Sequence, residues 1–390
     1  MKKVEKRDMA KQDRLYFIDN IRWLVISLVV VVHSAVTYSN MGRWYYYEPV
    51  TLDVASTTFF GIFLSFTQAY SMGILFLIAG YFVPGSLDRK GVAQFLRDRA
   101  VRLGIPTLVY MLFLYPAIDY YLLAFQWTAP RPSLGKYFLE YIQSLNFLGE
   151  SGPMWFALAL LIFSAIYAAH RQISHSKERL NPEGKLPGNL AVAGTILLIS
   201  AGAFTIRLVL PIGTALMNMQ LSFFSSYIIL FISGIIAYRN NWLLRIPYSL
   251  GMIWLKAALI GGSILWMTIM ILGGMVASGD FSKYEGGLYW QSAAYALWES
   301  FFCVGTCLGL IVLFREHMNW QGKQARFMSD NSFSVYLFHP PILILVSLAL
   351  RELAWLPIAK FIVSSAIAVP LCFFASHFIF RQVPLLKRVL

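Results

Sequence analysis

The chain has 390 residues, of which 58% are hydrophobic and only 13% are charged. Because soluble domains carry about a quarter charged residues, this composition excludes an ordinary soluble protein and indicates an integral membrane protein. The net charge of +13 does not indicate a nucleic-acid binder, since the basic residues lie in alternate connections instead of gathering on one water-facing surface. Cys303, Cys307 and Cys372 all lie in apolar segments, so we predict packing roles for them and no metal site.

Ten apolar segments are long enough to cross a bilayer as α-helices, which takes about 20 residues. They lie near residues 16–38, 58–84, 103–125, 153–170, 188–210, 221–239, 250–277, 288–314, 332–350 and 357–380. No connection is long enough for a separate soluble domain of about 50 residues or more. We therefore predict an all-α integral membrane protein. It is a bundle of about ten transmembrane helices that forms a single domain over residues 1–390 and has no C-terminal soluble domain.

The basic residues test this count, because the cytoplasmic connections of membrane proteins are enriched in Lys and Arg. Most of them lie in the N-terminal segment and in every second connection, whereas the opposite connections hold Arg43, Arg131, Lys136, Lys283, Arg351 and Lys360. This alternation predicts that both termini are cytoplasmic and that residues 1–15 form a basic cytoplasmic N-terminus. No cleavage pattern of small residues follows the first apolar segment, so we predict that this segment is retained.

The first segment contains Asp19, Arg22 and His33 in otherwise apolar sequence. Ionisable residues within a membrane usually face the protein interior or a water-filled cavity. Arg22 and His33 lie about 20° apart around a helix and roughly 16 Å apart along it, and Asp19 is one turn from Arg22. We predict a functional stripe, with Arg22 at the cytoplasmic entrance and His33 toward the far side. The alternative is an interfacial Asp19–Arg22 ion pair and a structural histidine, and composition alone leaves both open.

Two outer connections are rich in aromatic residues. The first contains NMGRWYYYEP, residues 40–49. Aromatic rings of this kind favour the membrane interface, although they also stack on sugars, so Trp44 is a candidate acceptor contact. The second contains KYFLEYIQSLNFL, residues 136–148, a pattern typical of a helix that lies along the interface.

Arg97, Arg99 and Arg102 precede the third apolar segment, and we expect Pro106 in the first turn of its helix. A helix start with nearby arginines suits phosphate binding. The alternative is the ordinary enrichment of basic residues in cytoplasmic connections.

Two further charges lie deep in later segments. Arg207 is predicted either to snorkel to the interface or to bind an anionic acceptor or acyl group. Glu299 is predicted to pair within the bundle, and the alternative is that it orients His33 or an arginine across the core.

The ninth segment contains SVYLFHPP, residues 334–341. We expect His339 a few residues into this helix from the cytoplasm. Pro340 and Pro341 free backbone carbonyls in the helix, so His339 either contacts a ligand or satisfies the released groups. Ser334 and Tyr336 are further candidates for binding.

Five stretches resemble conserved regions of the acyltransferase 3 family, in the family's order and over nearly the whole chain. They are DNIRWLVISLVVVVHSAV, FLIAGYFVPGSLDRKGVAQFLRDRAVRLGIP, GPMWFALALL, YIILFISGIIAYRNNWL and NSFSVYLFHPPILILV. In this resemblance His33 matches the family's essential histidine and Arg22 its essential arginine. Arg99 and Arg102 match the family's paired arginines.

The resemblance implies transfer of an acyl group, acetyl in preference to succinyl, from cytoplasmic acyl-CoA to a hydroxyl. The implied acceptor is an extracytoplasmic glycan, lipid-linked sugar or small molecule, and the implied location is the bacterial inner membrane. A central channel opened by Arg22, Arg99 and Arg102 would admit the donor. His33 would act as a general base, in preference to being acylated first. Acyl-CoA is then a donor substrate, and no permanently bound cofactor is expected.

The remaining candidates divide between the two substrates. Donor-binding candidates are Arg22, Arg99, Arg102, Arg97, His339, Ser334 and Tyr336, and acceptor-binding candidates are Asp19, Glu299, Arg207 and Trp44. Two other functions stay open: a transporter of an anionic metabolite, against which the lack of matching halves weighs, and a non-catalytic partner in polysaccharide export. A homodimer is also left open.

Overall fold

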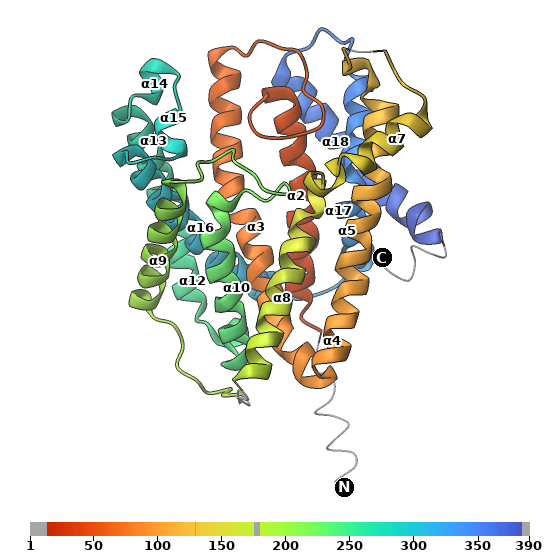
Figure 1. Ribbon diagram of the computed structural model, residues 1–390. Helices are drawn as coiled ribbons and strands as arrows, with labels where there is room; N and C mark the ends of the chain where they lie inside the picture. Colours follow the sequence, from red (N-terminus) through yellow and green to blue (C-terminus); the bar gives the residue numbers. More distant parts are fainter. Residues whose placement is uncertain (1–13, 129, 175–179, 384–390) are drawn as a thin grey trace.

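The computed structural model describes residues 14–128, 130–174 and 180–383. Within these ranges every regular element is a helix, apart from an isolated β-bridge between Leu216 and Met219. Ten helical segments are long and apolar enough to cross a membrane. The prediction of an all-α bundle with ten spans is therefore confirmed (Figure 1).

The spans follow the chain in the predicted order. They are α2 (Tyr16–Ser39), α3 (Val54–Lys90), the segment from α4 through α5 and α6 (Val92–Leu122), α8 (Trp155–Ile173), α9 (Asn189–Arg207), α10 (Phe224–Arg239), α12 with α13 (Tyr248–Leu272), α16 (Trp290–His317), α17 (Lys323–Ala349) and α18 (Pro357–Phe378). Between the third and fourth spans, α7 (Leu134–Gln143) confirms a helix in the predicted amphipathic stretch. Its exposed residues include Phe138 and Leu139.

Two predicted boundaries are wrong in ways that matter for function. The third span begins at Val92, directly after Gly91 with its positive φ of 73°, so Arg97, Arg99 and Arg102 lie on this helix and not before it. Pro106 is consequently well inside the span instead of in its first turn. Apolar content alone misplaces such starts, because a helix continues beyond the bilayer wherever its polar residues can reach water.

The ninth span also begins early, at Lys323, so His339 is sixteen residues into α17. At 1.5 Å per residue, this places His339 about 24 Å along the helix instead of near its start. The histidine is therefore deep in the bundle, which corrects the expectation that it lies a few residues from the cytoplasm.

Prolines shape the third span. Pro106 and Pro116 lack the N–H that an α-helix needs. The π-helical turns Ala100–Gly104 and Tyr110–Leu114 each end two residues before one of these prolines. Wider turns of this kind accommodate a break in the i→i−4 hydrogen-bond ladder, so the helix crosses the bundle without ending.

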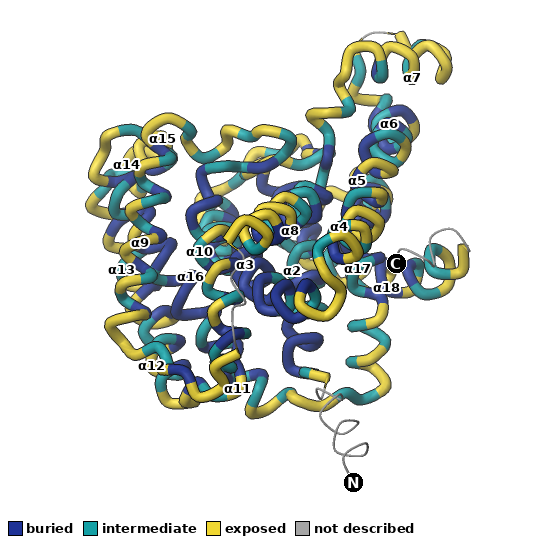
Figure 2. The backbone as a smooth tube through the Cα atoms, turned by 60° about the horizontal axis from the view of Figure 1, so that its bottom comes forward, coloured by how far each residue is buried: buried dark blue, intermediate teal, exposed yellow. Residues whose placement is uncertain are grey.

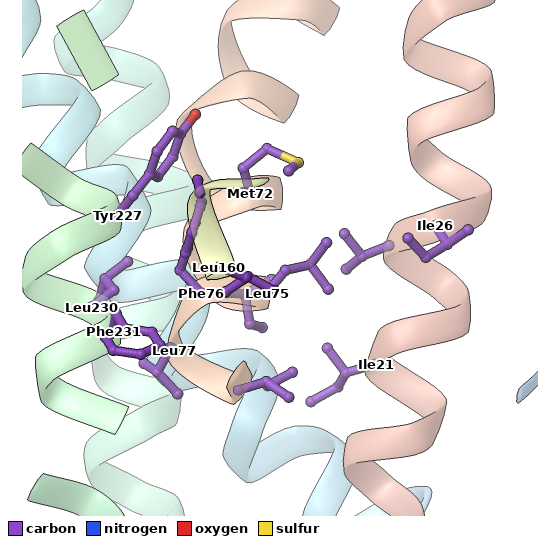
Figure 3. Close-up of a cluster of buried hydrophobic side chains, with 14 of the residues drawn as sticks. Ile21, Ile26, Met72, Leu75, Phe76, Leu77, Leu160, Tyr227, Leu230 and Phe231 are labelled. Atoms are coloured by element: carbon purple, nitrogen blue, oxygen red, sulfur yellow. The ribbon is translucent and has the colours of Figure 1, made fainter. Parts of the chain in front are cut away.

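Close packing holds α3 against α10. A Cβ on Gly80 would collide with the Phe231 carbonyl, and a Cβ on Gly234 would collide with the Leu77 carbonyl. Small residues let membrane helices approach this closely, where van der Waals contact replaces the hydrophobic effect as the attractive force. Figure 3 shows the neighbouring apolar cluster, in which Phe76, Leu160, Tyr227, Leu230 and Phe231 gather on one side and Ile21 and Ile26 of α2 lie on the other.

The helices differ in how deeply they lie in the bundle. Within the apolar windows, 72% of α16 and 61% of α17 is buried, against 22% of α9. Leu190 and Leu197 on α9 are exposed, as expected for a lipid-facing surface. The first helix, α2, contacts α3, α16, α17 and α18, and Figure 2 shows it as a buried element within the molecule. Side chains at both of its ends therefore meet residues from several distant segments.

Candidate active site

The two ends of α2 carry different groups, for which we use two names. The histidine end consists of His33, His339 and Trp44. The arginine end consists of Arg14, Asp19, Arg22, Arg99 and Arg102.

At the histidine end, two imidazoles face each other. His33 Nδ1 lies 3.0 Å from His339 Nε2, and the rings are nearly parallel, with centroids 5.1 Å apart. His339 is fully buried on α17, and its Nδ1 lies 2.9 Å from the carbonyl oxygen of Tyr336. His33 therefore contacts His339, which we expected from the sequence to lie near the cytoplasmic side.

Trp44 covers this pair from the connection between α2 and α3. Its ring stacks on His33 with centroids 4.0 Å apart and lies 5.7 Å from the His339 centroid. Trp44 Nε1 is buried and has no hydrogen-bond partner among the described residues. This N–H is therefore available to a ligand that reaches the two imidazoles.

A buried ion pair fixes the connection that carries Trp44. Glu48 N–H donates to the Thr37 carbonyl at 2.9 Å, and the Glu48 carboxylate accepts from Tyr46 Oη at 2.7 Å and from Lys360 Nζ at 2.5 Å. Lys360 also donates to the Arg351 carbonyl. From the sequence, Lys360 is only one of the basic residues in the outer connections, since nothing in the sequence connects it with Glu48.

A cavity of about 400 Å³ adjoins this ion pair and is lined in part by Glu48, Arg351, Trp355 and Lys360. His33 does not line it. The cavity therefore lies on the Lys360 side of the connection and does not belong to the histidine end.

Tyrosines and one carboxyl group surround the histidine end. Tyr45 packs edge-on against Trp44, and its hydroxyl is hydrogen-bonded to that of Tyr110. Tyr115 packs against Tyr45, with ring centroids 5.8 Å apart. Burial raises the pKa of Glu150, which lies in the connection close to Tyr115. This environment disfavours charge.

At the arginine end, Asp19 is shared by two guanidinium groups. Its Oδ1 lies 3.2 Å from Arg22 Nη1 and its Oδ2 lies 2.6 Å from Arg14 Nε. A cavity of about 220 Å³ opens there, lined by Arg14, Asp19, Arg22 and Arg89 among others. The predicted Asp19–Arg22 pair is present, and it stands at the edge of a cavity.

Arg99 and Arg102 add positive charge near this cavity. Arg22, Arg99 and Arg102 are close enough to repel one another electrostatically. No ion pair joins Arg99 or Arg102 to a carboxylate in the described part of the chain. Arg97 lies two residues before Arg99, which turns it about 200° away around a helix. It is not among the charges that repel Arg22 or Arg99. The structure therefore groups Arg99 and Arg102 with Arg22 and leaves Arg97 apart.

Of the other candidates, Tyr336, Arg207 and Glu299 have structural partners, whereas Ser334 has none among the described residues. Tyr336 Oη donates to the Pro153 carbonyl, which joins α17 to the start of the fourth span. The Ser334 hydroxyl is buried without a described partner. Arg207 is fully buried and its Nη2 lies 2.5 Å from Glu299 Oε2, so the alternative that Arg207 snorkels to the interface is wrong. Glu299 pairs within the bundle, as predicted, and its partner is this arginine.

Among the described residues, no three His, Cys, Asp or Glu side chains lie close enough together to hold a metal ion. The histidine end itself offers two imidazoles and an indole N–H.

Comparison with known proteins identifies the family. A family model described as an acyltransferase domain, acyltransferase 3, matches residues 15–377. No curated protein and no solved structure matches the chain. The matched region contains both ends of α2, the first nine spans and all but the last residue of α18. The chain belongs to the acyltransferase 3 family and is a membrane acyltransferase.

Proposed function

We propose that this protein transfers an acyl group, acetyl in preference to succinyl, from cytoplasmic acyl-CoA to a hydroxyl on the other side of a bacterial inner membrane. The acceptor is a glycan, a lipid-linked sugar or a small molecule. Both termini are cytoplasmic in this proposal, and the arginine end faces the donor. The observation that carries it is the arrangement around α2. Mutually repelling arginines gather beside one end of this helix, and Arg99 and Arg102 among them have no ion-pair partner in the described residues. A pair of imidazoles lies at the other end.

The arginine end supplies positive charge for the phosphate groups of a CoA thioester. Guanidinium groups bind phosphate oxygens with paired, charge-assisted hydrogen bonds. Arg99 and Arg102 have no described carboxylate partner, so phosphates would relieve their mutual repulsion. The uncharged arm of the donor would then extend along α2 toward His33, roughly 16 Å away along the helix axis from Arg22.

The histidine end supplies a base. In the proposed reaction His33 takes the proton of the acceptor hydroxyl while the oxygen attacks the thioester carbonyl carbon. The C–S bond then breaks, and the imidazolium returns the proton to the departing thiolate of CoA. Acylation of His33 in a first step is the alternative route. We favour direct transfer because it requires one reaction centre and forms no acyl-histidine intermediate that water could hydrolyse.

Trp44 is placed to contact an acceptor that approaches from the side of the membrane opposite the donor. Its indole N–H is buried and unpartnered, and its ring rests on His33. An acceptor hydroxyl that hydrogen-bonds to this N–H would lie beside the imidazole. The indole also excludes water, which would otherwise compete for the thioester.

The test uses purified full-length protein in detergent. We expect the wild type to bind acetyl-CoA and to release CoA when monosaccharides or glycerol are added as hydroxyl acceptors. His33→Ala should bind acetyl-CoA with unchanged affinity and release CoA about 10²- to 10⁴-fold more slowly, the usual contribution of a general base.

The controls separate donor binding from chemistry. His317→Ala removes a histidine outside the site and should leave both measurements unchanged. Absence of acetyl-CoA and succinyl-CoA binding by the wild type would overturn the proposal. Full CoA release by a folded His33→Ala protein would overturn the role of His33.

A further inference from the structure

The second imidazole of the histidine end has no role in the reaction described above. His339 is fully buried, lies beneath Trp44, and faces His33 through Nε2. We infer that His339 is a positioning residue: its contact with the Tyr336 carbonyl sets the tautomer of His33, so that His33 Nε2 holds the lone pair that accepts a proton. This inference rests on the proposed function for its kinetic consequence, although the tautomer itself can be tested separately.

The Tyr336 carbonyl lacks its usual helical donor. In a regular α-helix this oxygen would accept from the N–H of the residue four positions later, which here is Pro340. Proline has no N–H, so the carbonyl is left free inside the bundle. His339 Nδ1 lies 2.9 Å from it. A carbonyl can only accept, so the proton must be on His339 Nδ1.

The position of the proton on His339 determines the tautomer of His33. A neutral imidazole that carries its proton on Nδ1 has a lone pair on Nε2. His339 Nε2 therefore accepts, and the group 3.0 Å away, His33 Nδ1, must donate. With its own proton on Nδ1, a neutral His33 has its lone pair on Nε2. The chain from Tyr336 through His339 thus fixes which nitrogen of His33 is the base.

The surroundings keep His339 neutral. Its side chain is fully buried, and no described ion pair includes it. An uncompensated charge at such a position is strongly disfavoured. If His339 were doubly protonated, its Nε2 would donate, and His33 would have to accept through Nδ1. His33 Nε2 would then carry the proton and could not act as the base.

Stacking holds the arrangement in place. The rings of His33 and His339 are 8° from parallel, and Trp44 lies within 14° of both. The indole lies directly on the His33 ring, with centroids 4.0 Å apart, and so opposes rotation of that ring out of the shared plane. The hydrogen bond to His339 favours the same ring orientation.

The first measurement needs no acyl-acceptor substrate. In ¹⁵N-histidine-labelled protein in detergent, the His33 signals can be assigned by difference with His33→Gln. We expect Nδ1 to be protonated and Nε2 to be unprotonated in the wild type. In His339→Leu, which fills the space but cannot accept, the Nε2–H form of His33 should appear. A wild-type His33 with its proton on Nε2 would overturn the inference.

The second measurement is kinetic. His339→Leu should lower kcat about 10- to 100-fold, as loss of an orienting partner usually does, while the KM for acetyl-CoA stays unchanged. His339→Gln should recover most of the rate, because its amide oxygen can accept from His33 Nδ1. A raised KM with unchanged kcat would instead make His339 a donor contact and overturn the positioning role.

Pro340→Ala provides a variant that removes neither imidazole. The new N–H at position 340 competes for the Tyr336 carbonyl, so the hydrogen bond that holds the proton on His339 Nδ1 is weakened and kcat should fall several-fold. Pro341→Ala is the matched control, because it restores a donor for Leu337 and not for Tyr336. Equal rates for the two folded variants would count against the chain from Tyr336. A fully active His33→Ala protein would reject the proposed role of His33 as the base while leaving the tautomer result intact.

Discussion

The two ends of α2 show two ways in which a membrane helix holds polar groups. At the arginine end the side chains of Arg14 and Arg22 are 51% and 43% exposed and share Asp19 beside an open cavity. At the histidine end His339 has no exposed surface and Trp44 covers both imidazoles. Long, solvated arginines adapt to a ligand, whereas packed rings have one geometry. We therefore expect substitutions at the arginine end to change binding and those at the histidine end to change turnover.

The largest effect should come from breaking the ion pair that holds the Trp44 connection. Lys360→Ala leaves the Glu48 carboxylate buried without its partner, which typically costs about 3–5 kcal/mol. The thermal midpoint of the detergent-solubilised protein should fall clearly. The turnover of acetyl-CoA should also fall, because Trp44 is no longer held over His33, while acetyl-CoA binding persists.

The control for this ion pair is the double variant Glu48→Gln with Lys360→Met. It removes both charges, so it should regain most of the stability that Lys360→Ala loses. A Lys360→Ala protein with wild-type stability would show that the pair does not hold the connection.

The next largest effect should appear at the arginine end. Arg99→Ala or Arg102→Ala removes a charge-assisted hydrogen bond worth about 1.5–3 kcal/mol, so the KM for acetyl-CoA should rise roughly 10- to 100-fold with little change in kcat. Arg97→Ala is the matched control, since Arg97 lies on another face of the same helix. An equal rise in KM for Arg97→Ala would point to a general electrostatic effect instead of a shared site.

A smaller effect should follow from Trp44→Ala. Stacked aromatic pairs contribute about 0.5–1.5 kcal/mol beyond their buried area, so loss of the indole should lower kcat about 2- to 10-fold. Trp44→Phe keeps the stacking and removes the N–H, so a comparison of the two variants separates covering from hydrogen bonding. Unchanged initial rates in both variants would remove Trp44 from the site.

The smallest effect concerns the carboxyl group near the histidine end. Burial raises the pKa of Glu150 above its usual value of about 4.3. The folded protein therefore binds this proton more tightly than the unfolded chain, so stability is greatest below that range and declines as the pH rises through the folded pKa. Glu150→Gln should remove this decline, and its thermal midpoint at neutral pH should be slightly higher than that of the wild type. A lower midpoint for the variant at neutral pH would show that the charged form is stabilised there.

The apolar segments determined the fold class, because a helix that crosses a bilayer must be long and apolar wherever it lies in the bundle. The alternation of basic residues correctly supported ten spans. Spacing along one helix also placed Asp19 beside Arg22, since neighbours one turn apart meet in any α-helix. These are local properties, and the sequence is sufficient for them.

The partners of His33, Glu48 and Arg207 were decided only by the tertiary structure. They are His339, Lys360 and Glu299, which lie 306, 312 and 92 residues away in sequence. The sequence offered a reason for His33 and Arg207 to need a partner, because polar groups inside apolar segments must be paired. For Glu48, which lies in an outer connection, it offered none. It could not say which partner, because that depends on how α2, α9, α16, α17 and α18 pack, and their apolar contacts are not directional.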